Sequence, residues 1–290
     1  MRLPCVLVVV CLFMLNVEKS HGQHFDFGYE YGYSSYFGDL APYSAIPSGS
    51  SHAASKGYYF GYGNKWGTLF VNYTTTEISA SDMEAAAVNR QKRNLSFKSP
   101  ILEYGVTAEI NLWGLIRNDY TRFRPVLITG ANLFYFTPQA LYKNEWIDLQ
   151  PLGTEGQETD AFPDRKKYRL TQVSIPIGAG IKFDLTEHIW FGTGIKARMT
   201  FTDYLDDVST TYVDPEILIQ QNGSLAAELA FRSDEINPNE GYPKNGSFRG
   251  NPNENDWYMT TYVTIGFRFK QDKRRKRFRR KRHSLKCPSF

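Results

Sequence analysis

Residues 171–214 read TQVSIPIGAGIKFDLTEHIWFGTGIKARMTFTDYLDDVSTTYVD. In the second arm of this stretch, residues 189–201, apolar side chains alternate with glycine, threonine, lysine and arginine. Such alternation over about thirteen residues exceeds the ~5–6 residues of a typical soluble strand, whereas strands that cross a bilayer need roughly 9–11 residues. The first arm, residues 171–185, alternates in the same way. The stretch therefore predicts a hairpin of a membrane β-barrel, with Lys196 and Arg198 facing the barrel interior because charges face lipid only at high cost.

The N-terminal segment has the pattern of a secretory signal peptide. Arg2 supplies the positive end, and the apolar run over residues 6–15 is too short for a spanning helix. We expect cleavage before Gln23. A lipoprotein signal at Cys11 is the alternative, but Val10 stands where that signal needs a small residue.

Alternating segments elsewhere bring the predicted number of strands to eight. The fifth segment is apolar on both faces, so its orientation stays open. The segments are residues 24–33, 56–62, 66–75, 100–112, 124–136, 171–185, 189–201 and 257–269.

The connections between these strands alternate between short and long. The short ones are residues 63–65, 113–123 and 186–188, and the long ones are residues 34–55, 76–99, 137–169 and 202–256. Outer-membrane barrels have short periplasmic turns and long extracellular loops, whereas a soluble sandwich, the alternative fold, has no reason to sort its loops in this way. The sequence predicts an eight-stranded antiparallel outer-membrane β-barrel over residues 23–269, with both termini in the periplasm.

Charged residues lie on the predicted inner faces of the strands. A barrel of eight strands is just wide enough to be filled by side chains, so we expect these charges to pair and close the lumen rather than to serve catalysis. The predicted lumen residues are Asp26, Glu30, Glu103, Glu109, Lys182, Lys196, Arg198 and Arg268.

Residues 270–290 form a basic tail with eleven lysine and arginine residues against one acid, Asp272. A solvated tail without a partner is one interpretation; the preferred one is a periplasmic arm that docks on an acidic surface, not on nucleic acid. The predicted contact residues are Lys273, Arg274, Arg275, Lys276, Arg277, Arg279, Arg280, Lys281 and Arg282.

Cys287 becomes the single cysteine once a signal peptide with Cys5 and Cys11 is removed. A lone cysteine in an oxidising compartment pairs between chains or stays a free thiol, so Cys287 is a candidate for an intermolecular disulfide.

The sequence offers no catalytic set and no cofactor motif, and its histidines have no metal-ligand spacing. The acidic loop around Asp206 leaves calcium open as an alternative, because oxygen-rich loops suit that ion. Its spacing is not that of an EF-hand.

Several longer motifs are distinctive: YFGDL (residues 36–40), WIDLQPLGTEGQ (146–157), LTQVSIP (170–176), FTDYLDDVSTTY (201–212), RGNP (249–252) and DWY (256–258). Together these motifs resemble those of the PorG-like family of outer-membrane β-barrels from Bacteroidota.

This resemblance implies a role in type IX protein secretion and gliding motility. Such barrels tie a periplasmic ring, built from a lipoprotein and its partner of the PorK and PorN type, to the outer membrane. The implied function is thus structural and non-enzymatic, acting through the periplasmic turns and the basic tail. The alternatives are an adhesin that acts through the long loops and, less favoured, a small-solute pore or a barrel enzyme.

Overall fold

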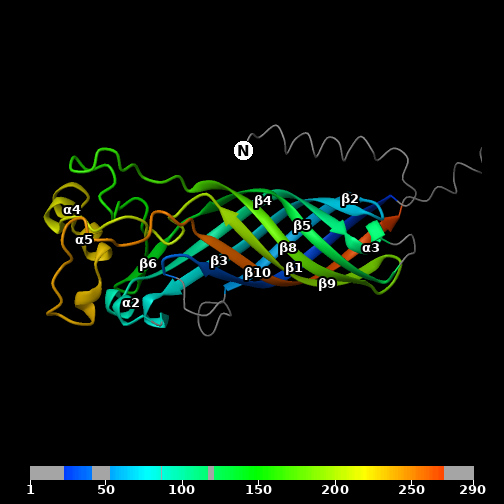
Figure 1. Ribbon diagram of the computed structural model, residues 1–290, viewed down its shortest axis with the longest axis horizontal. Helices are drawn as coiled ribbons and strands as arrows, with labels where there is room; N and C mark the ends of the chain where they lie inside the picture. The colour runs from blue at the N-terminus through cyan, green and yellow to red at the C-terminus, as the bar shows by residue number, and fades with distance from the viewer. Residues whose placement is uncertain (1–22, 41–52, 86, 117–120, 271–290) are drawn as a thin grey trace, which may run out of the picture.

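A computed structural model describes residues 23–40, 53–85, 87–116 and 121–270. The chain forms one closed β-barrel with a folded cap at one end (Figure 1). The barrel strands are β1 (His24–Phe37), β2 (Ala53–Gly63), β3 (Gly67–Ser81), β4 (Ser96–Asn111), β5 (Phe123–Phe136), β8 (Thr171–Asp184), β9 (Ile189–Thr200) and β10 (Trp257–Lys270).

Each barrel strand pairs antiparallel with its neighbours in sequence, and β1 closes the ring by pairing with β10 along its whole length. The closure leaves no free edge among these strands, as a barrel in lipid requires. β8 and β9 form the predicted hairpin, and Lys182 is opposite Gly192 and Gly178 opposite Lys196 in its register. The predicted eight-stranded antiparallel barrel is confirmed.

Strand ends differ from the prediction mainly at the long-loop end. β1 continues to Phe37, β3 continues to Ser81, and β4 begins at Ser96. The strands extend beyond the segments that have an apolar outer face. Backbone pairing continues there although outward residues such as Ser79 are polar. At the other end, β10 runs one residue past the predicted barrel boundary, to Lys270.

The fifth strand, whose orientation the sequence left open, has a definite inner face. Val126, Ile128, Phe134 and Phe136 are buried in the barrel, and the alternate residues are exposed. Register with β4 decides this orientation, because Glu103 and Phe134 are directly opposite and point to the same side.

The second, third and fourth long loops contain secondary structure of their own, which the sequence did not predict. The third long connection contains the hairpin of β6 (Gln139–Tyr142) and β7 (Glu145–Asp148), and β6 extends the sheet by pairing with β4. The second contains the 3₁₀ helix η2 (Asp82–Glu84) and α2 (Val88–Arg93), and the fourth contains α4 (Pro215–Gln221), α5 (Ser224–Ala230) and the 3₁₀ helix η3 (Ser233–Glu235). At the opposite end, a short connection begins with α3 (Leu112–Ile116).

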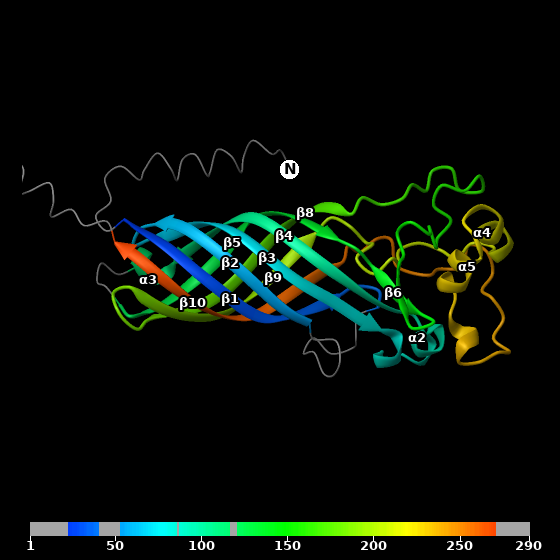
Figure 2. The same cartoon turned by 180° about the vertical axis from the view of Figure 1, so that it is seen from behind.

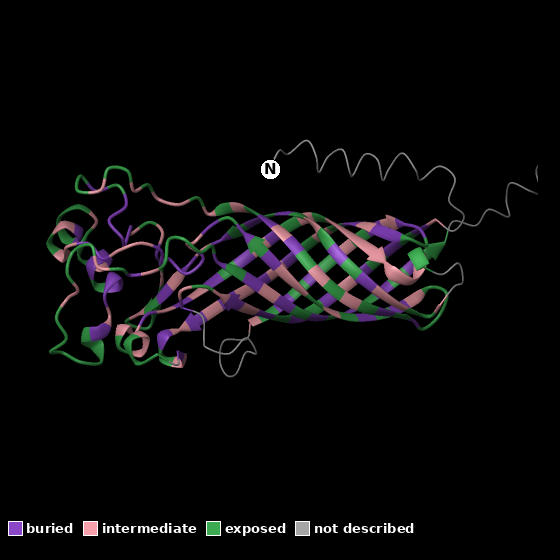
Figure 3. Cartoon of the chain, in the orientation of Figure 1, coloured by how far each residue is buried: buried purple, intermediate pink, exposed green. Residues whose placement is uncertain are grey.

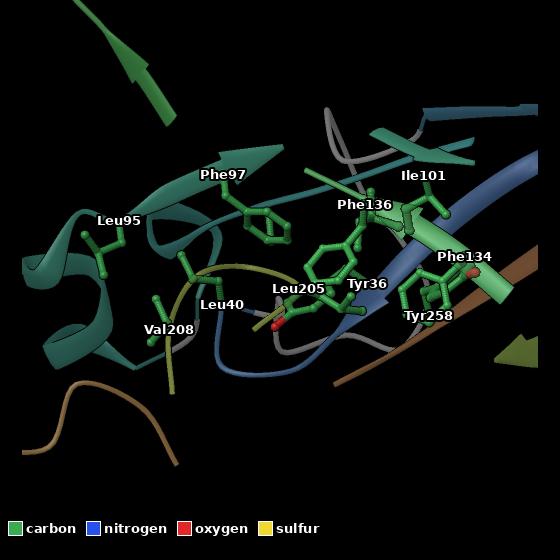
Figure 4. Packing of buried hydrophobic residues seen from close by; sticks show 12 residues of the cluster. Tyr36, Leu40, Leu95, Phe97, Ile101, Phe134, Phe136, Leu205, Val208 and Tyr258 are labelled. Carbon is green, nitrogen blue, oxygen red and sulfur yellow. The ribbon is translucent and has the colours of Figure 1, made fainter. Parts of the chain in front are cut away.

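The folded loops stack on the barrel mouth as a cap, seen from both sides in Figures 1 and 2. A buried cluster joins the cap to the barrel (Figure 4), with Phe134 and Tyr258 from the strands packing in the same cluster as Leu205 and Val208 from the fourth long loop. Two further clusters, around Leu218 and around Leu229, lie within the cap. In the described part of the chain, no helix is long and apolar enough to cross a membrane.

Candidate functional site

The eight predicted lumen charges meet inside the barrel in four ion pairs. The pairs are Asp26 with Arg268 (2.8 Å), Glu30 with Lys196 (2.7 Å), Glu103 with Arg198 (3.3 Å) and Glu109 with Lys182.

Three of these pairs join strands that are not neighbours, so their side chains span the lumen. Glu103 on β4 reaches Arg198 on β9, and it also accepts a hydrogen bond of 2.9 Å from the Tyr258 hydroxyl on β10. A buried ion pair adds little net stability, yet removing one partner costs about 3–5 kcal/mol because a charge is left buried alone. The pairs therefore fill the lumen and hold its strands in one arrangement.

Large side chains occupy the space between these pairs. Trp190 is 1% exposed, and the Lys182 ammonium lies 3.9 Å from its ring centroid. A cavity of about 30 Å³ lies between Glu30, Glu109 and Tyr262, room for only one or two water molecules. The lumen around these residues therefore has the character of a packed core.

A second polar network orders the cap, and Glu155 is its centre. The Glu155 carboxylate is fully buried and accepts hydrogen bonds from the backbone N–H groups of Ser209 and Thr210, both at 2.9 Å. The Arg249 guanidinium pairs with it at 3.0 Å. Because all three partners lie on the fourth long loop, Glu155 joins the third loop to the fourth.

Arg249 is buried and also donates a 2.5 Å hydrogen bond to the carbonyl oxygen of Asp207. Burial opposes the charged guanidinium, but the carboxylates of Glu155 and Asp207 outweigh it and raise the pKa of Arg249. The Asp207 carboxylate accepts hydrogen bonds from Thr154 and Tyr168, and burial raises its pKa to about 6.

A pair of buried carboxylates shares one hydroxyl where the cap meets the barrel. The Tyr36 hydroxyl lies 2.8 Å from Asp206 Oδ2 and 2.6 Å from Asp256 Oδ1. A hydroxyl has one hydrogen to donate, so the second contact needs a proton on one carboxyl group. Burial raises the pKa of Asp206 to about 7 and also raises that of Asp256. The charge of Asp39 adds to the effect at Asp206, and the charge of Asp206 adds to it at Asp256.

A second ion pair of the cap lies within the second long loop, and its arginine also contacts other loops. Arg93, at the end of α2, makes a two-pronged pair with Asp82, both contacts being 2.7 Å. The same guanidinium donates to the carbonyl oxygens of Arg249 and Asp39. The cap is thus one polar unit assembled from several connections.

The acidic loop that left calcium open is part of this unit. Asp206 and Asp207 accept hydrogen bonds from protein groups, and Asp214 caps α4 through the N–H of Glu216. Within the described residues no group of His, Cys, Asp and Glu side chains has the arrangement of a metal site. The carboxylates of this loop order the cap.

Sequence reasoning missed Glu155, Arg249 and Asp256 as site residues. Each lies in one of the motifs on which the family resemblance was based, at residues 146–157, 249–252 and 256–258. Their position inside these motifs is the available signal. Because the three residues lie in different parts of two long loops, their spacing in the sequence does not indicate which of them are in contact. The predicted tail residues from Lys273 to Arg282, with Cys287, lie outside the described residues.

The outer surface of the barrel is an apolar belt. Exposed and buried residues alternate along the strands (Figure 3), and many of the exposed ones are large apolar side chains. An exposed apolar surface of this extent is unfavourable in water and suited to lipid. The belt includes Phe27, Phe60, Val71, Leu133, Ile177, Ile195, Val263 and Ile265.

Solved structures of bacterial outer-membrane barrels match the chain at low sequence identity. Neisserial surface protein A has 9% identity and a TM-score of 0.40, with 84% of this chain and 97% of that chain covered. Ail of Yersinia pestis has 9% identity and a TM-score of 0.36 (87% and 100% covered), and the N-terminal barrel of Pseudomonas aeruginosa OprF has 13% and 0.32 (86% and 100%). No curated protein sequence matches the chain.

A closed antiparallel barrel with an apolar belt is the form in which β-structure spans the bacterial outer membrane, so the protein is an outer-membrane β-barrel protein. The family model described as a domain of unknown function, DUF6089, matches residues 5–214. The chain belongs to the DUF6089 family.

Proposed function

We propose that this protein is a non-conducting, non-enzymatic barrel that anchors a periplasmic ring complex of the type IX secretion and gliding machinery to the outer membrane. The observation that carries the proposal is the filled lumen, crossed by the pairs Glu30–Lys196 and Glu103–Arg198. A barrel without a passage acts through its ends. The PorG-like motifs support the finer role.

In this proposal the short-turn end faces the periplasm and contacts the ring lipoprotein and its partner (PorK and PorN type). Exposed apolar side chains are available there, with Leu115 60% and Ile116 72% exposed on α3 and Leu185 53% exposed between β8 and β9. β10 ends at Lys270 at this same end, beside Glu187, so the basic tail starts where the contact would be made. The tail supplies charge, and Cys287 is proposed to form a disulfide to the partner.

The test is a mild-detergent pull-down of the tagged, full-length protein from its native envelope, on reducing and non-reducing gels. We expect ring proteins with the wild type and a band lost both on reduction and in Cys287→Ser. Truncation after Lys270 should abolish the association, whereas Lys244→Gln in the cap should leave it unchanged. Recovery of the barrel alone from wild-type envelopes would contradict the anchor.

The folded cap favours a second candidate, an adhesin that binds through the loops. Phe248 is 79% exposed although its backbone is held in a bridge with Thr211, an arrangement suited to presenting an apolar side chain to a partner. Under this alternative, Phe248→Ser reduces binding to the target surface and tail truncation has no effect. The anchor predicts the opposite pattern.

A further inference from the structure

The outward faces of the eight barrel strands carry three charged side chains, and all three lie on adjacent strands. They are Lys56 on β2, Glu77 on β3 and Lys98 on β4. Each is flanked in sequence by buried residues that face the lumen, which places it on the outer face. Figure 2 shows β2, β3 and β4 side by side on one flank of the barrel.

Register brings the three charges together. Lys56 is opposite Thr75 and Lys98 is opposite Ser79, so Glu77 stands between them as the diagonal neighbour of both. Diagonal neighbours on one sheet face are roughly 7–8 Å apart, within reach of long side chains. The patch of Lys56, Glu77 and Lys98 has a net charge of +1.

The height of this patch corresponds to the upper edge of the apolar belt. A strand tilted by about 40° climbs roughly 2.5 Å per residue, so Glu77, ten positions above Gly67, lies about 25 Å above the lower end of β3. That is the approximate height of the apolar band of an outer-membrane barrel. Lys56 lies lower, and a lysine there extends its ammonium group toward the headgroups.

Two aromatic features accompany the charges. The Lys98 ammonium lies 3.9 Å from the centroid of the Trp146 ring, on the hairpin that extends β4. Below, a row of directly opposed tyrosines crosses the same strands: Tyr58, Tyr73 and Tyr104. The row continues beyond Tyr58 as Tyr29 on β1. On the far side of Tyr104 it gives way to Leu133 and then Val173. The tyrosine row therefore covers the flank that has the lysines and one strand beside it.

We propose that this flank binds one phosphorylated lipid of the leaflet at the long-loop end. Lys56 and Lys98 hold the headgroup phosphate, and the rings of Tyr58, Tyr73 and Tyr104 receive the acyl chains. The net charge of +1 complements one phosphate, and the height is that of a headgroup. Glu77 opposes the anion and limits its affinity.

The test is native mass spectrometry of the purified full-length protein in detergent with phosphorylated lipid A as the probe, beside its dephosphorylated form. Each Lys near a membrane surface contributes on the order of 1 kcal/mol to attraction of an anionic headgroup, so Lys56→Gln with Lys98→Gln should lower binding of the phosphorylated probe about tenfold or more. Glu77→Gln should raise it. The matched control is Lys92→Gln with Lys244→Gln, two exposed cap lysines, which should bind like the wild type.

Heat-modifiable migration on gels is the control that tests whether each variant is folded. Equal binding by the double variant and the control, equal binding of the dephosphorylated probe, or a stably bound protein in place of lipid would each overturn the proposal. If the double variant does not fold, Glu77→Gln decides, because a patch without phosphate selectivity gives no increase in binding.

Discussion

At the residue scale, two buried carboxyl groups share the Tyr36 hydroxyl. Asp206 and Asp256 are buried, and both contact the same oxygen. Such a pair is satisfied when one carboxyl group is protonated and donates to the phenol oxygen while the phenol donates to the other. This geometry predicts that the cap holds an extra proton at this point below about pH 7.

This proton makes the stability of the cap depend on pH. The pKa of Asp206 is raised from 3.8 to about 7 and that of Asp207 to about 6. A group with a raised pKa in the folded state contributes stability that is fully present below its unfolded pKa and is lost as pH rises through the folded pKa. We expect amide exchange at Leu40 and Val208, whose N–H groups donate to Asp206, to speed up between about pH 4 and pH 7 beyond the intrinsic pH effect.

Asp256→Asn is the matched control for that experiment. Its amide oxygen still accepts from the N–H of Leu205, as Asp256 Oδ2 does at 2.9 Å, and its NH₂ group donates to Tyr36 as a protonated carboxyl would. We expect a flatter pH dependence in this variant. An unchanged pH dependence would mean that other groups bind the proton.

Arg249 is a second residue on which the cap depends. It is 4% exposed, and its loss leaves the Glu155 carboxylate buried without its cation. We expect Arg249→Ala to lower the free energy of cap opening by about 3–5 kcal/mol, seen as faster amide exchange at Ser209 and Thr210. Arg249→Lys keeps the charge and should show a smaller loss. Equal exchange in Arg249→Ala and the wild type would refute this role.

At the element scale, β1 and β2 fit together through a glycine and an aromatic ring. Gly28 is directly opposite Tyr59, and a Cβ atom at Gly28 would lie 2.3 Å from the Tyr59 ring. Gly28 is therefore needed for close packing and not for an unusual backbone conformation. Overpacking of this kind typically costs about 1–3 kcal/mol.

Gly28→Ala should reduce stability to guanidinium in detergent by that amount, because the ring must move. With Tyr59→Ala in the same chain the added cost of Gly28→Ala should shrink, which a double-mutant cycle measures. Gly241→Ala is the control, since a Cβ atom there has nothing within 4 Å among the described residues. Additive losses would show that the two residues do not interact.

The elements also show where sequence patterns stop being informative. The alternating pattern is evident in β3 up to Thr75 and in β4 from Pro100 onward, because the outer face is mainly apolar in these parts of the strands. Beyond these points Ile78 and Phe97 still point inward, but into the cluster under the cap. Their outward neighbours include Glu77 and Lys98, so the lipid-facing signal had ended although the pairing had not.

At the scale of the whole molecule, the filled lumen predicts that the barrel does not conduct ions. Arg198, Tyr258 and Trp190 are each 1% exposed, and the described cavity has room only for a water molecule or two. Protein reconstituted into planar bilayers should give no channel steps, beside a general porin as the positive control. Regular, ion-selective steps from the pure protein would contradict the packed lumen and the proposed function.

Periodicity along the chain, with the alternation of short and long connections, was enough to predict the class, the number of strands and the inner face of most strands. The physical reason is that a strand between lipid and a narrow lumen must alternate apolar and polar or small residues at every second position. Even the partners of the lumen charges were restricted to a small set, because opposite charges inside a narrow barrel have few other groups to meet.

The cap depended on the tertiary structure. Glu155 meets Ser209 and Arg249 only because two long loops fold against one another, and no periodic pattern relates positions so far apart. The charges of Lys56, Glu77 and Lys98 likewise become one patch only through strand register. Local alternation records which medium each side chain faces, whereas contacts between distant segments depend on how the whole chain closes.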